Sequence, residues 1–264
     1  MKNIMKSIWY EIYHSKLMIR IYIVFIFVMG LIGFLNSETE GGTYSAGASG
    51  MLADIHEVTY EFPIFILALI VGITCGEDYN DKVANYEVLS GHSRKSIFLA
   101  RSLMGIIVGS VFATLLCFVP MFTAWIKTGW GDSLVFGDVI IRTCLMIFPM
   151  LRLAAFFAVL TFLIKNPYII MAIGFITSMS PALLNNMLAH SKSIFVSIFN
   201  MGLLCDYKCW SIYNIDPSEG IVYYNSYESG VSSGLVIGTI VASLVMTAFY
   251  LFMGYALFRR DELN

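Results

Sequence analysis

The stretch Gly76–Ser96 (GEDYNDKVANYEVLSGHSRKS) is the longest polar segment on the predicted cytoplasmic side, and apolar runs bound it at both ends. Within it, Val83, Tyr86 and Leu89 recur at three-residue spacing, which predicts one or two turns of amphipathic helix. Gly91 follows just past these residues, where a helix-terminating glycine is expected. A short helix held between two membrane spans offers a surface on which a soluble partner can push. The alternative is an ordinary solvated turn.

The composition of the whole chain is that of an integral membrane protein. Of its 264 residues, 58% are hydrophobic and 13% are charged, and the mean hydropathy is +0.76. Soluble domains carry about 25% charged residues, so half of the usual solvating charge is missing. We therefore expect an all-α polytopic membrane protein that forms a single transmembrane domain over residues 1–264.

Six apolar runs are predicted as membrane spans, because a hydrocarbon core of ~30 Å needs roughly 20 residues of helix. They lie at about 19–36, 62–78, 97–126, 139–164, 168–188 and 232–258. Only Lys165-Asn166-Pro167 separates the fourth from the fifth, which predicts a tight hairpin whose proline stops one helix and starts the next. Residues 1–18 carry apolar and aromatic side chains on one helix face and predict an interfacial helix.

The segments between these spans differ in character. The outer loop 37–61 is rich in Gly and Ser in its first half and is expected to be mobile. In the outer segment 189–231, the apolar run Lys192–Leu204 is too short to span and aromatic residues follow it, which predicts a helical cap. The segment 79–96 is the cytoplasmic connection that contains the amphipathic helix.

The distribution of Lys and Arg sets the orientation of the chain. With both termini in the cytoplasm, eleven of these residues lie inside and only three outside, namely Lys127, Lys192 and Lys208. The outer segments then carry a formal charge of −8, which either attracts cationic peptides or merely satisfies the topology rule. The predicted location is the cytoplasmic (plasma) membrane.

Residues that could carry chemistry inside the membrane are few. No catalytic motif, P-loop or metal-ligand pattern occurs, and no Asp or Glu falls in the core of a span, which argues against an enzyme and against an ion-coupled carrier. Arg142 and Arg152 lie on the fourth span. Arg142 is near the outer end and can snorkel to the headgroups. Arg152 is near mid-membrane and is either a structural hydrogen-bond anchor or a cation facing a translocation cavity.

The order of motifs resembles that of type-2 ABC transporter permeases, the membrane subunits of bacterial exporters and immunity transporters for peptides. The acidic turn from Glu77 leads through a short helix to Leu89–Arg94 (LSGHSR) and the apolar run Ile97–Arg101 (IFLAR). The family shows a similar run before its third span. The basic ending Leu257–Leu263 (LFRRDEL) also resembles the close of the family after its last span.

The resemblance implies that segment 80–96 is the coupling helix for two separate ATPase subunits, which would bind ATP and Mg²⁺, while this chain binds no cofactor. The coupling residues would be Glu77, Asp81, Val83, Tyr86, Glu87, Leu89 and Arg94. A second permease chain would pair across spans two and five, around a path for a peptide or other amphipathic substrate. The residues expected on that path are Phe65, Thr74, Arg152, Thr177, Ser178 and Asn185. Membrane lipid is the other expected partner, and nucleic acid is not expected.

Two other functions stay open. The chain could be a membrane sensor or immunity protein that binds a peptide without moving it, or an ion-coupled secondary carrier. The loop cysteines Cys205 and Cys209 could form a disulfide or stay as free thiols.

Overall fold

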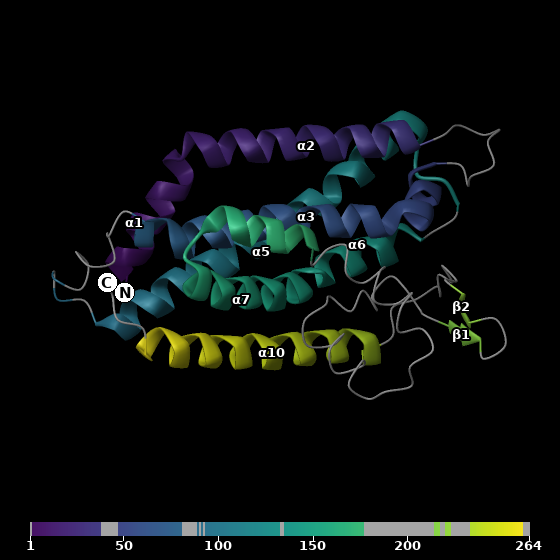
Figure 1. Cartoon of the computed structure of the whole chain (residues 1–264). Helices are drawn as coiled ribbons and strands as arrows, with labels where there is room; N and C mark the ends of the chain where they lie inside the picture. The colour runs from purple at the N-terminus through teal and green to yellow at the C-terminus, as the bar shows by residue number, and fades with distance from the viewer. Residues whose placement is uncertain are drawn as a thin grey trace.

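The computed structural model describes residues 2–37, 47–80, 89, 91, 93–132, 135–176, 214–216, 220–222 and 233–260. Its helices run in the order α1 (Lys2–His14), α2 (Lys16–Asn36), α3 (Gly47–Asn80), α5 (Arg94–Thr128), α6 (Phe136–Leu145), α7 (Ile147–Ile164) and α10 (Ser233–Arg260) (Figure 1). A further helical stretch covers Pro167–Ile176. The expected helical membrane protein is therefore confirmed at this coarse level.

The described chain also contains one short β-hairpin, within the segment 189–231 that was predicted to be a helical cap. Strands β1 (Asn214–Asp216) and β2 (Gly220–Val222) pair antiparallel, with Ile215 opposite Ile221. The apolar run Lys192–Leu204 lies outside the described residues. These strands are too short, at three residues each, to leave the alternating pattern by which strands are recognised in a sequence.

Among the described residues, four helices are long and apolar enough to cross a membrane: Lys16–Asn36, Arg94–Thr128, Phe136–Ile164 and Val236–Arg259. These correspond to the first, third, fourth and sixth predicted spans. The second and fifth correspond to shorter apolar helices, Phe62–Gly76 within α3 and Pro167–Ile176. Six spans therefore stay a prediction.

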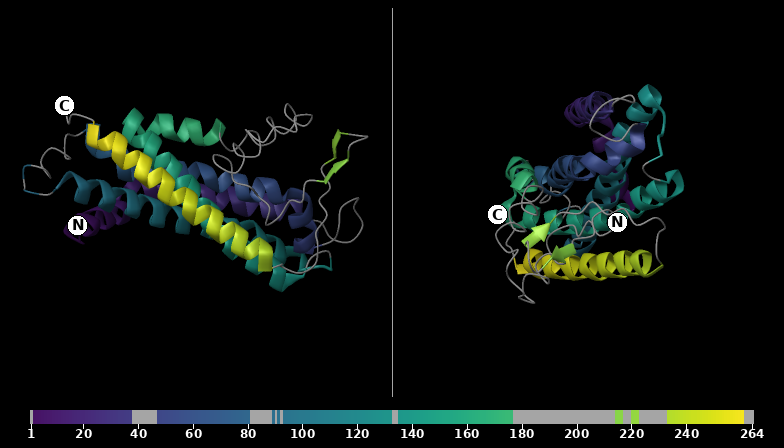
Figure 2. Two further views of the ribbon diagram at one scale, coloured as in Figure 1. Left: turned by 90° about the horizontal axis from the view of Figure 1, so that it is seen from below. Right: turned by 90° about the vertical axis from the view of Figure 1, so that its right-hand side faces the viewer.

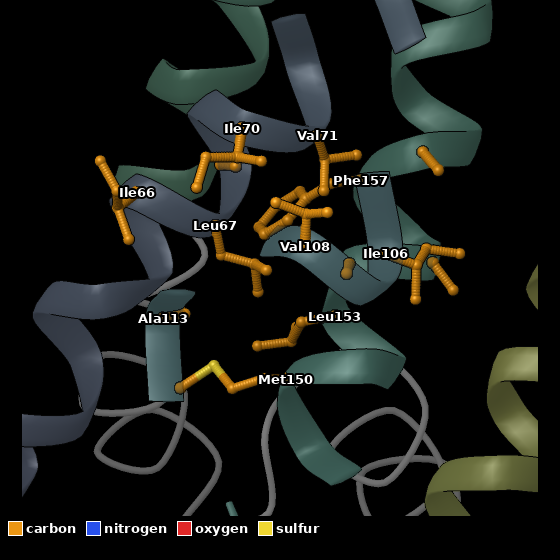
Figure 3. Close-up of a cluster of buried hydrophobic side chains, with 14 of the residues drawn as sticks. Ile66, Leu67, Ile70, Val71, Ile106, Val108, Ala113, Met150, Leu153 and Phe157 are labelled. Atoms are coloured by element: carbon orange, nitrogen blue, oxygen red, sulfur yellow. The ribbon is translucent and has the colours of Figure 1, made fainter. Parts of the chain in front are cut away.

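The core lies between α3, α5 and α7. Figure 3 shows Leu67 and Val71 of α3, Val108 of α5 and Leu153 and Phe157 of α7 converging on one another. All five are 5% exposed or less. The outer helices α2 and α10 lie on opposite sides of this core (Figures 1 and 2) and expose most of their apolar side chains.

Both ends of the described chain lie at the same end of the bundle. α1 and the C-terminal end of α10 both lie at the left-hand end of the bundle in Figure 1 and in the left view of Figure 2. We call this the α1 end. The side of the membrane that it faces stays a prediction.

Helix α3 begins much earlier than the predicted span, at Gly47 instead of residue 62, so the second half of the expected loop 37–61 is helical. The backbone N–H groups of Ala48 and Ser49 donate to the carbonyls of Gly129 (3.0 Å) and Trp130 (2.7 Å). A helix N-terminus needs partners for its first N–H groups, and the turn after α5 supplies two of them. The expectation of a mobile loop was wrong here because these partners lie about 80 residues away in the sequence.

The predicted fourth span is interrupted: α6 ends at Leu145 and α7 begins at Ile147. Pro149 lies three residues after the break. Proline has no N–H and its ring clashes with the carbonyl four residues earlier, which here is that of Leu145. The predicted span at about 139–164 therefore corresponds to one apolar stretch, Phe136–Ile164, that is broken at Met146 into α6 and α7.

The predicted hairpin after α7 is confirmed. Lys165 ends α7 in the left-handed conformation (φ 57°), and its N–H donates to the carbonyl of Thr161 at 2.7 Å. The Asn166 side chain then accepts from the N–H of Tyr168 (3.0 Å) and of Ile169 (3.3 Å). Pro167 therefore occupies the first helical position, where its missing N–H does no harm.

Candidate functional site

The end of α3 and the start of α5, which bound the predicted coupling segment, lie at the α1 end (Figure 1). Glu77 belongs to the last turn of α3, although its side chain is not described. Asp81, Val83, Tyr86 and Glu87 lie outside the described residues. Leu89 has a helical backbone and is 81% exposed. Gly91 has φ +90°, the conformation expected of a glycine that ends a helix.

α5 begins directly after this segment. The Ser93 hydroxyl caps it by accepting from the N–H of Ser96 at 3.3 Å, which is the usual role of serine at this position. Arg94 is the first helical residue and is exposed. Of the seven predicted coupling residues, the structure thus places the side chains of Leu89 and Arg94, and both face away from the bundle.

Arg101 links three helices at the α1 end. Sequence analysis counted it simply as an inner charge, but its side chain is only 2% exposed. Its backbone carbonyl accepts from the thiol of Cys75 on α3 (3.6 Å), and its guanidinium interacts electrostatically with Glu11 on α1. A buried arginine needs such compensation. The position of Arg101 about one turn inside an apolar run was the sequence signal that could have predicted its burial.

α1 is held against the bundle by one face only. Ile4 and Ile8 are 3% exposed and belong to the core, whereas Trp9, Tyr10 and Tyr13 are more than half exposed. Sequence analysis placed all of these residues at the membrane surface. The structure assigns the isoleucines to packing and leaves the aromatic rings available to a headgroup boundary, where such rings are favoured.

Phe65 and Thr74, both expected on a translocation path, lie on opposite faces of α3. Phe65 is half-buried, and the centroid of its ring lies 5.8 Å from that of Phe62 and 5.2 Å from that of Phe175. Thr74 is 5% exposed, and its hydroxyl donates to the carbonyl of Ile70 at 2.8 Å. Nine residues turn a helix by about 180° beyond whole turns, so the spacing itself excludes a shared face.

Thr74 lies at a close contact between α3 and α5. A Cβ atom built on Gly105 would be 2.5 Å from the Thr74 hydroxyl oxygen, and one on Gly109 would be 3.1 Å from Leu67. Two glycines four residues apart let neighbouring helices pack closely in a membrane. Thr74 therefore has a packing role in this chain, and its role on a translocation path stays a prediction.

Arg152 lies on α7 and is 4% exposed. It interacts electrostatically with Tyr250 on α10. The ring centroid of Tyr250 lies 5.7 Å from that of Phe156. The fifth-span residues expected near it, Thr177, Ser178 and Asn185, lie outside the described residues. Sequence reasoning missed Tyr250, although a tyrosine inside an apolar span needs a polar partner for its hydroxyl.

Arg142 does not snorkel to the surface as expected. It lies on α6 and is 6% exposed, so its side chain is inside the protein. Phe65, Thr74 and Arg152 thus lie at three different helix interfaces. In the described part of the chain, the predicted path residues do not gather around one cavity.

Two cavities instead adjoin the bend between α1 and α2. The first, which we call the elbow groove, has a volume of about 330 Å³ and is lined by Trp9, Ile12, Tyr13, Met18, Ile19, Tyr22, Ile23, Ile66, Leu69, Ile70 and Phe112. The second, of about 320 Å³, shares two of these residues and is lined by Ile8, Glu11, Ile12, His14, Ser15, Met18, Ile73 and Thr74. Sequence reasoning found neither, because each needs three or four helices to form.

Metal-ligand clusters of three or more His, Cys, Asp or Glu residues are absent from the described ranges. Cys75 and Cys117 are buried in apolar helices and are not in a disulfide, and they act there as small packing residues. Cys205 and Cys209 lie outside the described residues. No family model matches the chain, and no curated protein matches it.

Proposed function

We propose that this chain is the permease subunit of an ATP-driven ABC exporter in the cytoplasmic membrane. Two permease chains would work with two separate ATPase subunits, which bind ATP and Mg²⁺. The substrate would be an amphipathic peptide, attracted by the acidic outer segments of the chain. This proposal extends the sequence resemblance, and the observations below support it.

The observation that carries the proposal is the exposure of Leu89. A leucine that is 81% exposed in the polar connection between two apolar helices lies outside any predicted span. Leucine in such a position gains free energy when a partner covers it. The amphipathic pattern of Val83, Tyr86 and Leu89 favours an ATPase subunit, docked at the α1 end, as this partner.

The close packing of α3 on α5, the two helices that flank the coupling segment, suits the transmission of movement. The coupling segment joins the end of α3 to the start of α5, and these helices are in close contact at Gly105 and Gly109. Tightly packed helices move as a unit. A push on the segment would therefore tilt α3 and α5 together, and the packing of Ile4 and Ile8 in the core would carry α1 with them.

The aromatic contact between α3 and the helix Pro167–Ile176 supports pairing with a second permease chain. Phe65 is half-buried and Phe175 is 50% exposed, so these rings from the second and fifth predicted spans share an open surface. A second copy covering this surface would bury both rings. The substrate path would then lie between the two chains.

The experiment is to purify the chain in nanodiscs with the ABC ATPase encoded beside its gene and to measure ATP hydrolysis. Leu89→Ser should weaken ATPase binding about tenfold, as truncation of a central interface side chain does. Ile126→Ser is the matched control, because Ile126 is 85% exposed at the opposite end of α5. Tyr86→Ala and Glu87→Ala test the rest of the segment.

Equal effects of Leu89→Ser and Ile126→Ser in an intact complex would refute the coupling role. Failure of the wild-type chain to bind any ABC ATPase would refute the exporter itself and leave the sensor and carrier alternatives. Peptide-stimulated hydrolysis that vanishes only with the segment variants is the expected result.

A further inference from the structure

The elbow groove is an apolar cavity between α1, α2, α3 and α5. Its lining consists of aliphatic and aromatic side chains, and Tyr22 directs its hydroxyl away to the carbonyl of Phe112 (3.2 Å). The volume of about 330 Å³ is at the lower end of the range for ligand pockets, roughly 300–1,000 Å³. A slender apolar molecule is the kind of occupant that such a groove accepts.

Cations border the groove where it meets the α1 end. On α2, Lys16, Ile19, Arg20 and Ile23 follow the i, i+3, i+4, i+7 pattern, so the two cations share a face with the two groove-lining isoleucines. Lys16 precedes both isoleucines, and Arg20 lies between them. On α1, Lys6 precedes the lining residue Trp9 by three positions.

These three cations are available to a ligand. Lys6, Lys16 and Arg20 are all exposed. The bend between α1 and α2 is therefore a basic site beside an apolar groove, with Trp9 and Tyr13 exposed at its rim.

We propose that the elbow groove holds one anionic phospholipid, with an acyl chain along Ile19, Ile23 and Phe112 and the phosphate against Lys16 and Arg20. Seven residues separate Lys16 from Ile23, which is about 10 Å along a helix. A headgroup at the cations thus places the first part of its acyl chain beside the apolar lining. The aromatic rings at the rim match the level of the headgroups.

The headgroup must supply the selectivity of this site. An acyl chain leaving the bilayer for an apolar groove gains no hydrophobic free energy, because lipid tails are as apolar as the groove. The groove therefore accepts the chain of any phospholipid equally well. Basic residues near the membrane surface favour anionic lipids by about fivefold each, so two cations predict a preference of about 25-fold over a zwitterionic lipid.

Trp9 provides the probe for a direct test, because it lines the groove. In a variant that keeps only this tryptophan (W125F, W130F and W210F), nanodiscs containing phosphatidylglycerol with brominated acyl chains should quench its fluorescence. Brominated phosphatidylcholine at the same mole fraction should quench it much less. Native mass spectrometry of the unsubstituted chain, which needs no tryptophan changes, should show retained phosphatidylglycerol.

Matched variants separate the two halves of the site. K16Q/R20Q should abolish the headgroup preference, whereas K95Q/R259Q, which removes two exposed cations elsewhere at the α1 end, should not. Ile23→Phe should fill the groove and reduce quenching by both lipids. Val24→Phe is its control, because Val24 is 57% exposed against 58% for Ile23 but does not line the groove.

Three results would overturn the proposal. Equal quenching of Trp9 fluorescence by both brominated lipids, with Lys16 and Arg20 unchanged, would exclude a headgroup site. Equal effects of Ile23→Phe and Val24→Phe would exclude the groove. Displacement of brominated phosphatidylglycerol by a candidate peptide substrate, with no displacement by excess unlabelled phosphatidylglycerol, would make the groove a peptide site instead. All three readouts are independent of ATPase binding.

Discussion

The contact between Gly105 and Thr74 makes a quantitative prediction about the packing of α3 on α5. A Cβ atom on Gly105 would lie 2.5 Å from the Thr74 hydroxyl oxygen and 3.2 Å from the Cys75 sulfur. The hydroxyl has little room to yield, because it is buried and donates to the carbonyl of Ile70 at 2.8 Å. Overpacking of this kind costs typically 1–3 kcal/mol, so we expect Gly105→Ala to destabilise the protein by about 2 kcal/mol.

The assay is thermal unfolding in detergent. Unfolding is detected by the labelling of the buried thiols with a fluorescent maleimide as they become exposed. A loss of about 2 kcal/mol corresponds to a fall in melting temperature of roughly 4–8 °C for a chain of this size. Gly238→Ala is the control. Gly238 lies within α10 with nothing within 4 Å of a built Cβ atom, so alanine should be neutral or slightly stabilising there.

A double variant tests the cause. Thr74→Ala removes the clashing hydroxyl oxygen and leaves the Thr74 Cβ atom 3.6 Å from the Cβ atom built on Gly105, an ordinary contact. Gly105→Ala in the Thr74→Ala background should then cost much less than in the wild type, giving a coupling of 1 kcal/mol or more. Strictly additive melting temperatures would refute the reasoning, because the cost would then not arise at this contact.

Two smaller contacts give further predictions. Lys127→Met removes two hydrogen bonds from the ammonium group to the carbonyls of Phe34 and Ser37 (2.6 Å each), so the last turn of α2 should exchange its amide hydrogens faster while the rest of α2 does not; uniform exchange along α2 would contradict this role. Asn166→Ala removes the cap of the helix that follows α7 and should cost about 1 kcal/mol, or roughly 2–4 °C in melting temperature, whereas Asn166→Asp should retain most of the stability.

Local signals predicted the parts of the fold that local chemistry decides. The hairpin at Lys165–Pro167 was predictable because proline and asparagine act on neighbouring backbone groups. The positive φ at Gly91 was predictable for the same reason. The break at Met146 was also within reach of local reasoning, because Pro149 disfavours a continuous helix across it.

The rest depended on residues far apart in the sequence. The start of α3 at Gly47 requires carbonyls from Gly129 and Trp130, and no pattern around residue 47 indicates them. The burial of Arg142 and the neighbourhood of Arg152 and Tyr250 are likewise properties of packed helices. For the candidate site, helix periodicity alone could have separated Phe65 from Thr74, but the elbow groove required the bundle.

The packing of α2 has a consequence for how the protein is made. α2 is the most apolar of the four helices that are long enough to cross a membrane, and only 17% of its apolar window is buried in the protein. Its main partner is α5, which it meets closely at Gly33. The ribosome synthesises α2 before any residue of α5 exists. If α2 crosses the membrane, it must therefore stay in the lipid without its main partner during the early part of translation, and its apolar surface favours this.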